Sequence, residues 1–447
     1  MATNHADILQ ELIGIFTDTE TSDVKAESLL EELGLDSIAA VQLANEMFLK
    51  LQLQIHPDEL FKISLNVLTE HLQKSPLPTS TGPKILAESD SAYEAAAHRS
   101  GFTNYWSIVS PLQNDLVLSY INEAFVTLGV DLSEQPCGVE ISIPSCIPKY
   151  DRLMKRLLDI LESRYIITQH GDKVLRGSDR IDVNTSSHLC EQLRIRHPTF
   201  ECEANLLNLI GPRLADCLNG KLDPLLVLFG TVSSRQIMER FYHSAPMMAA
   251  HTEQLVYFFV NLTKRIAACS PSPVRILEVG AGTGGTTAPL VAALEDAKVS
   301  VNYTFTDIGV SFIHKARGRW GRNQWMDFAT LDIEEEMPES FNAQYDIVIG
   351  TNVVHATRDR AETCRRLREV LRPGGVLVLS ELTRPIVWYD ICFGLLDGWW
   401  LSDDYAIQPT TVWMDALRMA GFKSTGHSKG NSEEANTQRL LVACNQD

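Results

Sequence analysis

Residues 276–287, ILEVGAGTGGTT, place a glycine-rich turn between an apolar run and the start of a helix. Gly280, Gly282 and Gly285 match the G-x-G-x-x-G spacing that occurs where a strand meets a helix beside a bound nucleotide. Glycines let the backbone turn tightly and approach a ligand without a Cβ in the way. The stretch therefore predicts a ligand site; a tight turn with no ligand is the alternative.

The chain around this turn alternates between strand-like and helical patterns. After the glycines, apolar runs end at residues 307, 351 and 382, with helical segments between them. Residues 423–430 and 437–445 follow a last helix and predict a terminal hairpin. Alternation of this kind predicts a doubly wound, mainly parallel sheet with helices on both faces over residues 251–447.

Acidic residues stand at or near the ends of three strand-like runs. Glu278 stands two residues before the first glycine, which suits a ligand with a cationic amino-acid part. Asp307 ends the next strand, where a carboxylate can accept hydrogen bonds from ribose hydroxyls, and Asp332 follows near a predicted adenine edge. These motifs, in this order, resemble class I methyltransferases that use S-adenosylmethionine, over about residues 270–447. An NAD-type dehydrogenase is the alternative.

The resemblance implies a seven-stranded, Rossmann-like sheet with an antiparallel last strand. It also implies a set of cofactor-binding residues, which are Glu278, Gly280, Gly282, Gly284, Asp307, Asp332 and Asn352.

Two further residues predict a base. His355 lies just beyond the fourth strand and Glu381 at the end of the fifth. In this family the two strands are neighbours, so the side chains are expected within hydrogen-bonding distance. A neutral imidazole is a competent base near neutral pH, and a carboxylate can fix its tautomer. Alone, His355 could merely shape a pocket and Glu381 could be a surface or capping carboxylate; the pair favours catalysis.

Three aromatic residues are candidates for the substrate pocket. Trp399 and Trp400 follow the fifth strand, where this fold inserts segments that cover the substrate, although paired aromatics are often ordinary core. Tyr242 lies just ahead of the sheet and could close over the cofactor or serve only for packing.

The chain before the sheet divides into three parts. Residues 99–250 are mainly helical with a small hairpin. Residues 75–98 contain three prolines with Ser, Thr and Gly, and predict an extended linker. Residues 1–74 predict a small all-α unit of four helices, with Ile38 and Val41 among the residues expected on a buried helix face.

Ser37, in LLEELGLDSIAAVQL (residues 29–43), begins one of these helices. A serine here can simply cap the helix. The stretch also resembles the Leu-Gly-x-Asp-Ser signature of acyl carrier proteins, which implies phosphopantetheine attachment at Ser37. Its acidic neighbours suit docking to basic partners, or form a solvated face; they are Glu31, Glu32, Asp36 and Glu46.

A carrier followed by a methyltransferase resembles the carrier-to-C-methyltransferase segment of fungal non-reducing polyketide synthases. The resemblance implies that residues 99–250 form a lid or substrate subdomain. It also implies methylation of the α-carbon of a carrier-bound β-ketoacyl thioester. His355, oriented by Glu381, would remove the proton, and the enolate would take the methyl group of S-adenosylmethionine. Implied partners are the ketosynthase, other synthase domains and a phosphopantetheinyl transferase. The chain is expected to be an excised piece or a partner in trans. An O- or N-methyltransferase and a silent spacer are the alternatives.

The net charge and the spacing of the cysteines argue against several classes of function. The net charge of −18, from 39 basic and 57 acidic residues, argues against a nucleic-acid-binding face, and we expect no cluster of Lys and Arg. No signal peptide or membrane span is predicted. Nine cysteines occur singly, which predicts no zinc or other metal site and no disulfide framework, and hence a reduced, cytoplasmic protein.

Overall fold

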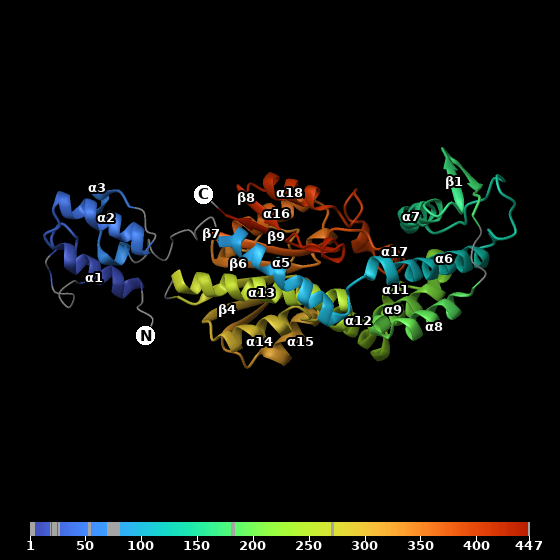
Figure 1. Ribbon diagram of the computed structural model, residues 1–447, viewed down its shortest axis with the longest axis horizontal. Helices are drawn as coiled ribbons and strands as arrows, with labels where there is room; N and C mark the ends of the chain where they lie inside the picture. Colours follow the sequence, from blue (N-terminus) through green and yellow to red (C-terminus); the bar gives the residue numbers. More distant parts are fainter. Residues whose placement is uncertain are drawn as a thin grey trace.

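The computed structural model describes residues 5–17, 19, 25, 27–51, 55–68, 81–179, 184–269 and 272–445. Figure 1 shows a small helical unit, an α/β part built on a twisted sheet, and a second helical part at the far side of that sheet. Within these described ranges, no helix is both long enough and apolar enough to span a bilayer.

The small unit contains α1 (His5–Thr17), α2 (Ser37–Leu51) and α3 (Pro57–Leu60). Residues 65–68 are helical, and the rest of the predicted last helix lies outside the described residues. The buried stripe of α2 runs through Ala40, Leu43 and Met47. The predicted buried face was wrong for Ile38 and Val41, which are 72% and 56% exposed, because the helical repeat places the stripe on the neighbouring positions.

Ser37 does not cap its helix. The Oδ1 atom of Asp36 accepts hydrogen bonds from the backbone N–H groups of Ile38 (2.9 Å) and Ala39 (2.7 Å). These are the hydrogen bonds of an N-cap side chain, so Asp36 caps the helix in the way that was expected of Ser37. Ser37 is exposed at the first helical position. The capping interpretation of Ser37 was therefore wrong.

The predicted linker is also wrong from residue 81 onwards. Residues Thr81–Ser100 form α5, which packs along α13 (Pro246–Cys269). Pro83 does not break α5 because it lies in the first turn, where backbone N–H groups lack intrahelical partners. Ile85 and Leu86 of α5 are buried in the core beneath the sheet. The α/β part therefore begins with α5, and the predicted boundary at 250/251 falls inside α13.

A seven-stranded sheet forms the centre of the α/β part, in the order β5-β4-β3-β6-β7-β9-β8. All neighbours are parallel except β9, which runs antiparallel to β7 and β8, as predicted. The strands are β3 (Val274–Val279), β4 (Val301–Asp307), β5 (Met326–Thr330), β6 (Tyr345–Thr351), β7 (Leu371–Leu382), β8 (Ser424–His427) and β9 (Gln438–Cys444).

Helices cover both faces of this sheet and bury two separate apolar cores. Residues of α13, α14 (Thr287–Ala297) and α15 (Val310–Trp320) pack in the first core. Residues of α16 (Arg360–Glu369) and α18 (Thr410–Met419) pack in the second. The doubly wound α/β fold predicted from the alternating pattern is confirmed.

The second helical part, which we call the lid, is mainly helical as predicted and contains the predicted hairpin, formed by β1 (Ile167–His170) and β2 (Lys173–Arg176). Its helices are α6 (Ser110–Thr127), α7 (Asp151–Glu162), α8 (Ser186–Arg196), α9 (Glu201–Ile210), α10 (Leu214–Leu218), α11 (Pro224–Phe229) and α12 (Val232–Ser244). The lid also contains a short π-helix, η1 (Tyr105–Val109), and the 3₁₀ turns η2 (Pro148–Tyr150), η3 (Pro198–Phe200) and η4 (Gly211–Arg213). Two further 3₁₀ turns, η5 (Glu339–Phe341) and η8 (Glu434–Asn436), lie in the α/β part.

The lid shares its apolar core with residues that follow β7. This segment contains α17 (Val387–Cys392) and the turn η7 (Asp397–Trp400). Trp388, Tyr389 and Trp399 are buried in the same cluster as the lid helices. The lid is thus packed around a piece of the α/β part rather than resting against it.

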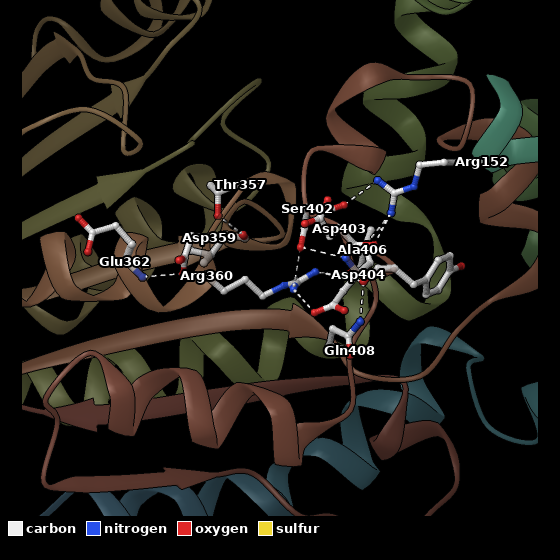
Figure 2. A network of polar contacts seen from close by, with 12 residues as sticks. Arg152, Thr357, Asp359, Arg360, Glu362, Ser402, Asp403, Asp404, Ala406 and Gln408 are labelled. Atoms are coloured by element: carbon white, nitrogen blue, oxygen red, sulfur yellow. Dashed lines mark hydrogen bonds and ion pairs between the residues drawn. The ribbon is translucent and has the colours of Figure 1, made fainter. Parts of the chain in front are cut away.

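Two arginines hold the loop after η7 from opposite sides (Figure 2). Arg152 of α7 donates to the carbonyl oxygens of Trp400 and Ser402 (2.7 Å each), and also to those of residues 403 and 404. Arg360, buried at the start of α16, donates to the carbonyl oxygen of Tyr405 (3.1 Å). Residues 400–406, which follow Trp399, are therefore tied both to α7 of the lid and to α16 of the α/β part.

Candidate active site

A cavity of about 340 Å³ lies over the carboxyl ends of β3, β6 and β7, beneath the lid. Most of the predicted site residues line it: Glu278, Gly280, Gly282, Asn352, His355, Tyr242 and Trp399. Ligands in open α/β sheets bind at this edge. The chain folds so that the glycine turn, the residues after β6 and the aromatic residues after β7 meet at one place.

His355 and Glu381 are brought together as predicted. His355 lies in the short turn η6 (Val354–Ala356) after β6, and its Nδ1 atom lies 2.8 Å from Oε2 of Glu381. The other carboxylate oxygen accepts hydrogen bonds from the backbone N–H groups of Val353 (3.0 Å) and Val354 (2.8 Å). Glu381 is fully buried, so these bonds hold it in place.

This arrangement selects one tautomer of the imidazole. The carboxylate can only accept at Nδ1, so the proton lies on Nδ1 and Nε2 keeps its lone pair. The side chain of His355 is 11% exposed, and its ring packs edge-on against Trp399 at a centroid distance of 6.0 Å. A histidine held in this way is able to accept a proton at Nε2.

The glycine turn packs directly against the residues that precede His355. Gly280 has a φ of +61°, and a Cβ at this position would overlap the side chain of Val353. Asn352 also has a positive φ, +49°, and its N–H donates to the carbonyl oxygen of Ser380 (2.9 Å). A non-glycine residue in this conformation is strained, which is frequent at functional sites.

Glu278 is a buried carboxyl group at the base of the cavity. Its Oε2 atom accepts hydrogen bonds from the hydroxyls of Thr287 (2.7 Å) and Tyr303 (2.8 Å). Burial raises the pKa of Glu278 to about 7, although the two hydroxyls oppose this shift. A carboxyl group near half-ionisation at neutral pH gains its charge readily when a cation binds beside it.

Three family descriptions match the chain. They are "Methyltransferase domain" over residues 277–377, "Methyltransferase, Helix-turn-helix domain" over residues 87–174 and "Phosphopantetheine attachment site" over residues 6–72. Among solved structures, the CMeT domain of the citrinin polyketide synthase is 32% identical with a TM-score of 0.79, and the match covers 83% of this chain and 98% of that one. The chain belongs to the polyketide synthase C-methyltransferase family. The CurJ carbon methyltransferase (25% identity, TM-score 0.70, 81% and 99% coverage) agrees.

Curated relatives of this chain are much longer proteins. The non-reducing polyketide synthase atr1 of Stereocaulon alpinum is 35% identical over 97% of this chain and 20% of its own length. The non-reducing polyketide synthase dpmpA of Macrophomina phaseolina is 36% identical over 94% of this chain and 21% of its own length. The chain thus spans about a fifth of these relatives.

The C-methyltransferase family implies S-adenosylmethionine as methyl donor, and the cavity fits this molecule. Glu278 offers a buried carboxylate to a cationic amino-acid part. A Cβ on Gly282 would point into open space, so the glycine leaves room for a ligand against the backbone. The buried Oδ1 of Asn352 has no partner among the described residues. These are features that a bound polar ligand would complete.

Three predicted cofactor residues do not line the cavity. Asp307 accepts from the N–H groups of Gly282 (2.8 Å) and Gly309 (2.7 Å), which ties the glycine turn to the end of β4. Asp332 is half-buried and accepts from the N–H of Glu334 (2.9 Å). Their contacts to ribose and adenine stay predictions. Gly284 lines a neighbouring cleft instead.

Of the three aromatic residues predicted to form the substrate pocket, two line the cavity and one does not. Tyr242 and Trp399 line the cavity together with Phe241, Tyr389 and Phe393. Tyr242 is 36% exposed as a residue, yet burial of its hydroxyl raises its pKa to about 12. Trp400 was wrongly predicted as a pocket wall. Its indole N–H donates to Gly394 (2.7 Å) and its ring stacks on the guanidinium of Arg152 at 5.1 Å, outside the lining.

Sequence reasoning missed the polar groups that β6, α17 and β9 add to the cavity. The hydroxyls of Tyr389 and Thr351 are buried without a partner among the described residues. Gln438 begins β9, pairs with Leu382, and donates to the hydroxyl of Ser380 (2.7 Å). The predicted antiparallel direction of β9 could have identified Gln438, because an antiparallel strand begins at the edge of the sheet where the parallel strands end.

The raised pKa of Glu278 predicts that the affinity for S-adenosylmethionine depends on pH. The carboxyl group is neutral below pH 7 and charged above it, and only the charged form attracts a cation. Affinity should therefore rise by up to about tenfold per pH unit as the pH approaches 7 from below, then level off. Calorimetry across this range measures the profile. Glu278→Gln should bind more weakly with a flat profile; a flat profile in the unaltered chain would contradict the assignment.

Proposed function

We propose that this chain methylates the α-carbon of a β-ketoacyl chain held as a thioester on phosphopantetheine, during polyketide biosynthesis. The observation that carries the proposal is the hydrogen-bonded pair of His355 and Glu381 in the cavity. A carbon acceptor must lose a proton before it can take a methyl group, whereas an oxygen or nitrogen acceptor already has a lone pair. A dedicated base therefore favours a carbon acceptor.

His355 accepts the proton at Nε2. The proton lies on the carbon between two carbonyl groups and is acidic for that reason. Glu381 stabilises the imidazolium that forms, while two backbone N–H groups bind its other oxygen and hold the carboxylate in place. When bound, S-adenosylmethionine supplies an electrophilic methyl group. Holding the acceptor carbon in line with that group is the remaining task of the cavity.

The polar lining suits a chain that is rich in carbonyl groups. The hydroxyls of Tyr389 and Thr351 are buried, unpaired among the described residues and at the cavity. A buried hydroxyl without a partner costs about 1–3 kcal/mol, which a carbonyl acceptor on the substrate would recover. The aromatic wall of Phe241, Phe393 and Trp399 suits the carbon skeleton between such groups.

Ser37 is the proposed attachment point for the carrier arm. It is exposed and, because Asp36 caps the helix, modification of its hydroxyl removes no capping bond. The matched description "Phosphopantetheine attachment site" covers this unit. A phosphopantetheinyl transferase and a ketosynthase are then required partners. Nine unpaired cysteines support a reducing, cytoplasmic location.

A loading experiment tests this function. Incubation with a phosphopantetheinyl transferase and β-ketobutyryl coenzyme A should add one acyl arm by intact-protein mass spectrometry, and S-adenosylmethionine should then add one methyl group. NMR of the released acid should place that methyl on the α-carbon. Ser37→Ala should take up no arm and keep its helix, because the cap is Asp36. A methyl group found on oxygen, or an arm retained in Ser37→Ala, would contradict the proposal.

A further inference from the structure

An open cleft of about 540 Å³ adjoins the cavity. On the lid side it is lined by Arg240 and His243 of α12, and on the sheet side by Lys315 and Arg319 of α15. Four residues line both hollows, namely Gly282, Thr283, Gly285 and Phe312. The cleft therefore leads into the active-site cavity at the glycine turn.

The sheet side of this cleft is basic, which the sequence analysis overlooked. Residues 308–326 contain no Asp or Glu and four Lys or Arg residues, in a chain of net charge −18. The expectation that no Lys and Arg cluster exists was wrong, because the run is short and its charges gather only when α15 forms. An acid-free run of this length was the available signal.

The basic side chains at the cleft are exposed and available. Arg240, Lys315 and Arg319 form no ion pair with any described residue, and Arg319 lies over the Trp320 ring at 4.5 Å. Glu239 is the acidic residue in the lining. Unpaired charges of one sign around an opening concentrate a positive potential there, which attracts an anionic partner.

An apolar surface accompanies these charges along α11 and α12. Leu225, Leu226 and Val232 are 53%, 63% and 65% exposed. Phe229, between them in the chain, lines the active-site cavity. Val232 lies on the same helix as Arg240, and Leu225 and Leu226 lie on the helix before it. Exposed apolar side chains that accompany unpaired charges are typical of a surface that binds another protein.

The carrier unit has the complementary features around Ser37. Glu31, Glu32 and Asp36 are exposed, and residues 26–49 contain no Lys or Arg. Ile38 and Val41 are exposed on α2, next to the attachment serine. A phosphopantetheine arm adds a phosphodiester anion at the same point.

We propose that the surface formed by α11, α12 and α15 docks the holo carrier unit, residues 5–68. This deepens the proposed function, on which it rests. The acidic residues and the arm's phosphodiester face Arg240, Lys315 and Arg319, and Ile38 and Val41 pack on Leu225 and Leu226. The arm then enters the cavity beside Phe312 and reaches His355.

Charge reversal in the full chain tests the docking. The triple variant R240E/K315E/R319E, loaded with a β-ketobutyryl arm on Ser37, should transfer the methyl group to that arm at least about tenfold more slowly. The same variant should methylate a small, free β-ketobutyryl thioester within about twofold of the unaltered rate, and bind S-adenosylmethionine equally well. Added salt should slow the unaltered chain and leave the variant nearly unchanged.

A matched control has the same change in net charge elsewhere. Lys155, Arg196 and Lys221 are exposed and line neither hollow, so K155E/R196E/K221E should behave like the unaltered chain. Glu31→Lys with Glu32→Lys should restore part of the lost rate in the cleft variant. Equal rates on the Ser37-bound arm would overturn the docking, and so would equal losses on the arm and on the free thioester. No transfer to either substrate by the unaltered chain would remove the proposed function and the docking with it.

Discussion

His355→Ala should lower the rate of carbon methylation by about 10²–10⁴-fold, the usual contribution of a general base. The reason is geometric: Nε2 of His355 keeps its lone pair inside the cavity because Nδ1 is committed to Glu381 at 2.8 Å. Affinity for S-adenosylmethionine should stay within about twofold, because no described contact of His355 holds the glycine turn. Rates on a free β-ketoacyl thioester, with calorimetry of cofactor binding, measure both. Near-normal turnover would exclude His355 as the base.

Glu381→Gln is the sharper companion of this variant. Glutamine can keep the two bonds from Val353 and Val354 through its carbonyl oxygen, and then its NH₂ group faces Nδ1 of His355. The imidazole must accept at Nδ1, so its proton moves to Nε2 and the base is lost without loss of shape. The single and double variants should therefore be about equally slow, since the pair acts as a unit. Additive losses would contradict a shared role.

Gly280→Ala should abolish cofactor binding and lower the melting temperature. The left-handed backbone conformation, with φ +61°, costs an alanine about 1–2 kcal/mol. The new Cβ would also overlap the side chain of Val353, and overpacking of this kind costs about 1–3 kcal/mol. Displacing Val353 disturbs a backbone N–H that holds Glu381, so the catalytic pair should suffer as well. Calorimetry with S-adenosylmethionine and thermal melting measure the two effects.

Two further variants separate the cost of the backbone conformation at Gly280 from the cost of the overlap with Val353. Gly282→Ala has a similar φ, +56°, but its Cβ would meet no atom within 4 Å. It should therefore weaken cofactor binding while it lowers the melting temperature less than Gly280→Ala. Adding Val353→Ala to Gly280→Ala removes the overlapping methyl groups and should recover part of the stability. If Gly280→Ala binds the cofactor normally, the glycine turn is not the cofactor cradle.

The alternating pattern of the last 200 or so residues predicted the sheet because parallel α/β folds have few topologies. The pairing of His355 with Glu381 followed from the order of two neighbouring strands. Errors arose where the outcome depends on tertiary context. The segment of α5 resembles a linker in composition, yet Ile85 and Leu86 are buried against α13. Helix α2 has apolar residues on two faces, and only packing decides which face is buried.

The polar lining of the cavity was out of reach for another reason. Tyr389 reaches the site from α17, and its position depends on how the lid helices enclose that segment. Trp399 and Trp400 lie in the same short turn, but only Trp399 faces the cavity. Trp400 instead contacts Arg152, which is nearly 250 residues away in the chain. Neither outcome follows from local patterns.

The shared core and the double arginine hold have a consequence for recombination between synthases. A crossover at residue 250 would cut through α13 and would pair the lid of one enzyme with the α17–η7 segment of another. Trp388 and Tyr389 would then pack against lid residues from a different enzyme. Arg152 of one enzyme would likewise have to bind the carbonyl oxygens of another. The unit that can be exchanged intact runs from the start of α5 to the end of β9, so grafts of a new methylation specificity need both halves from one parent.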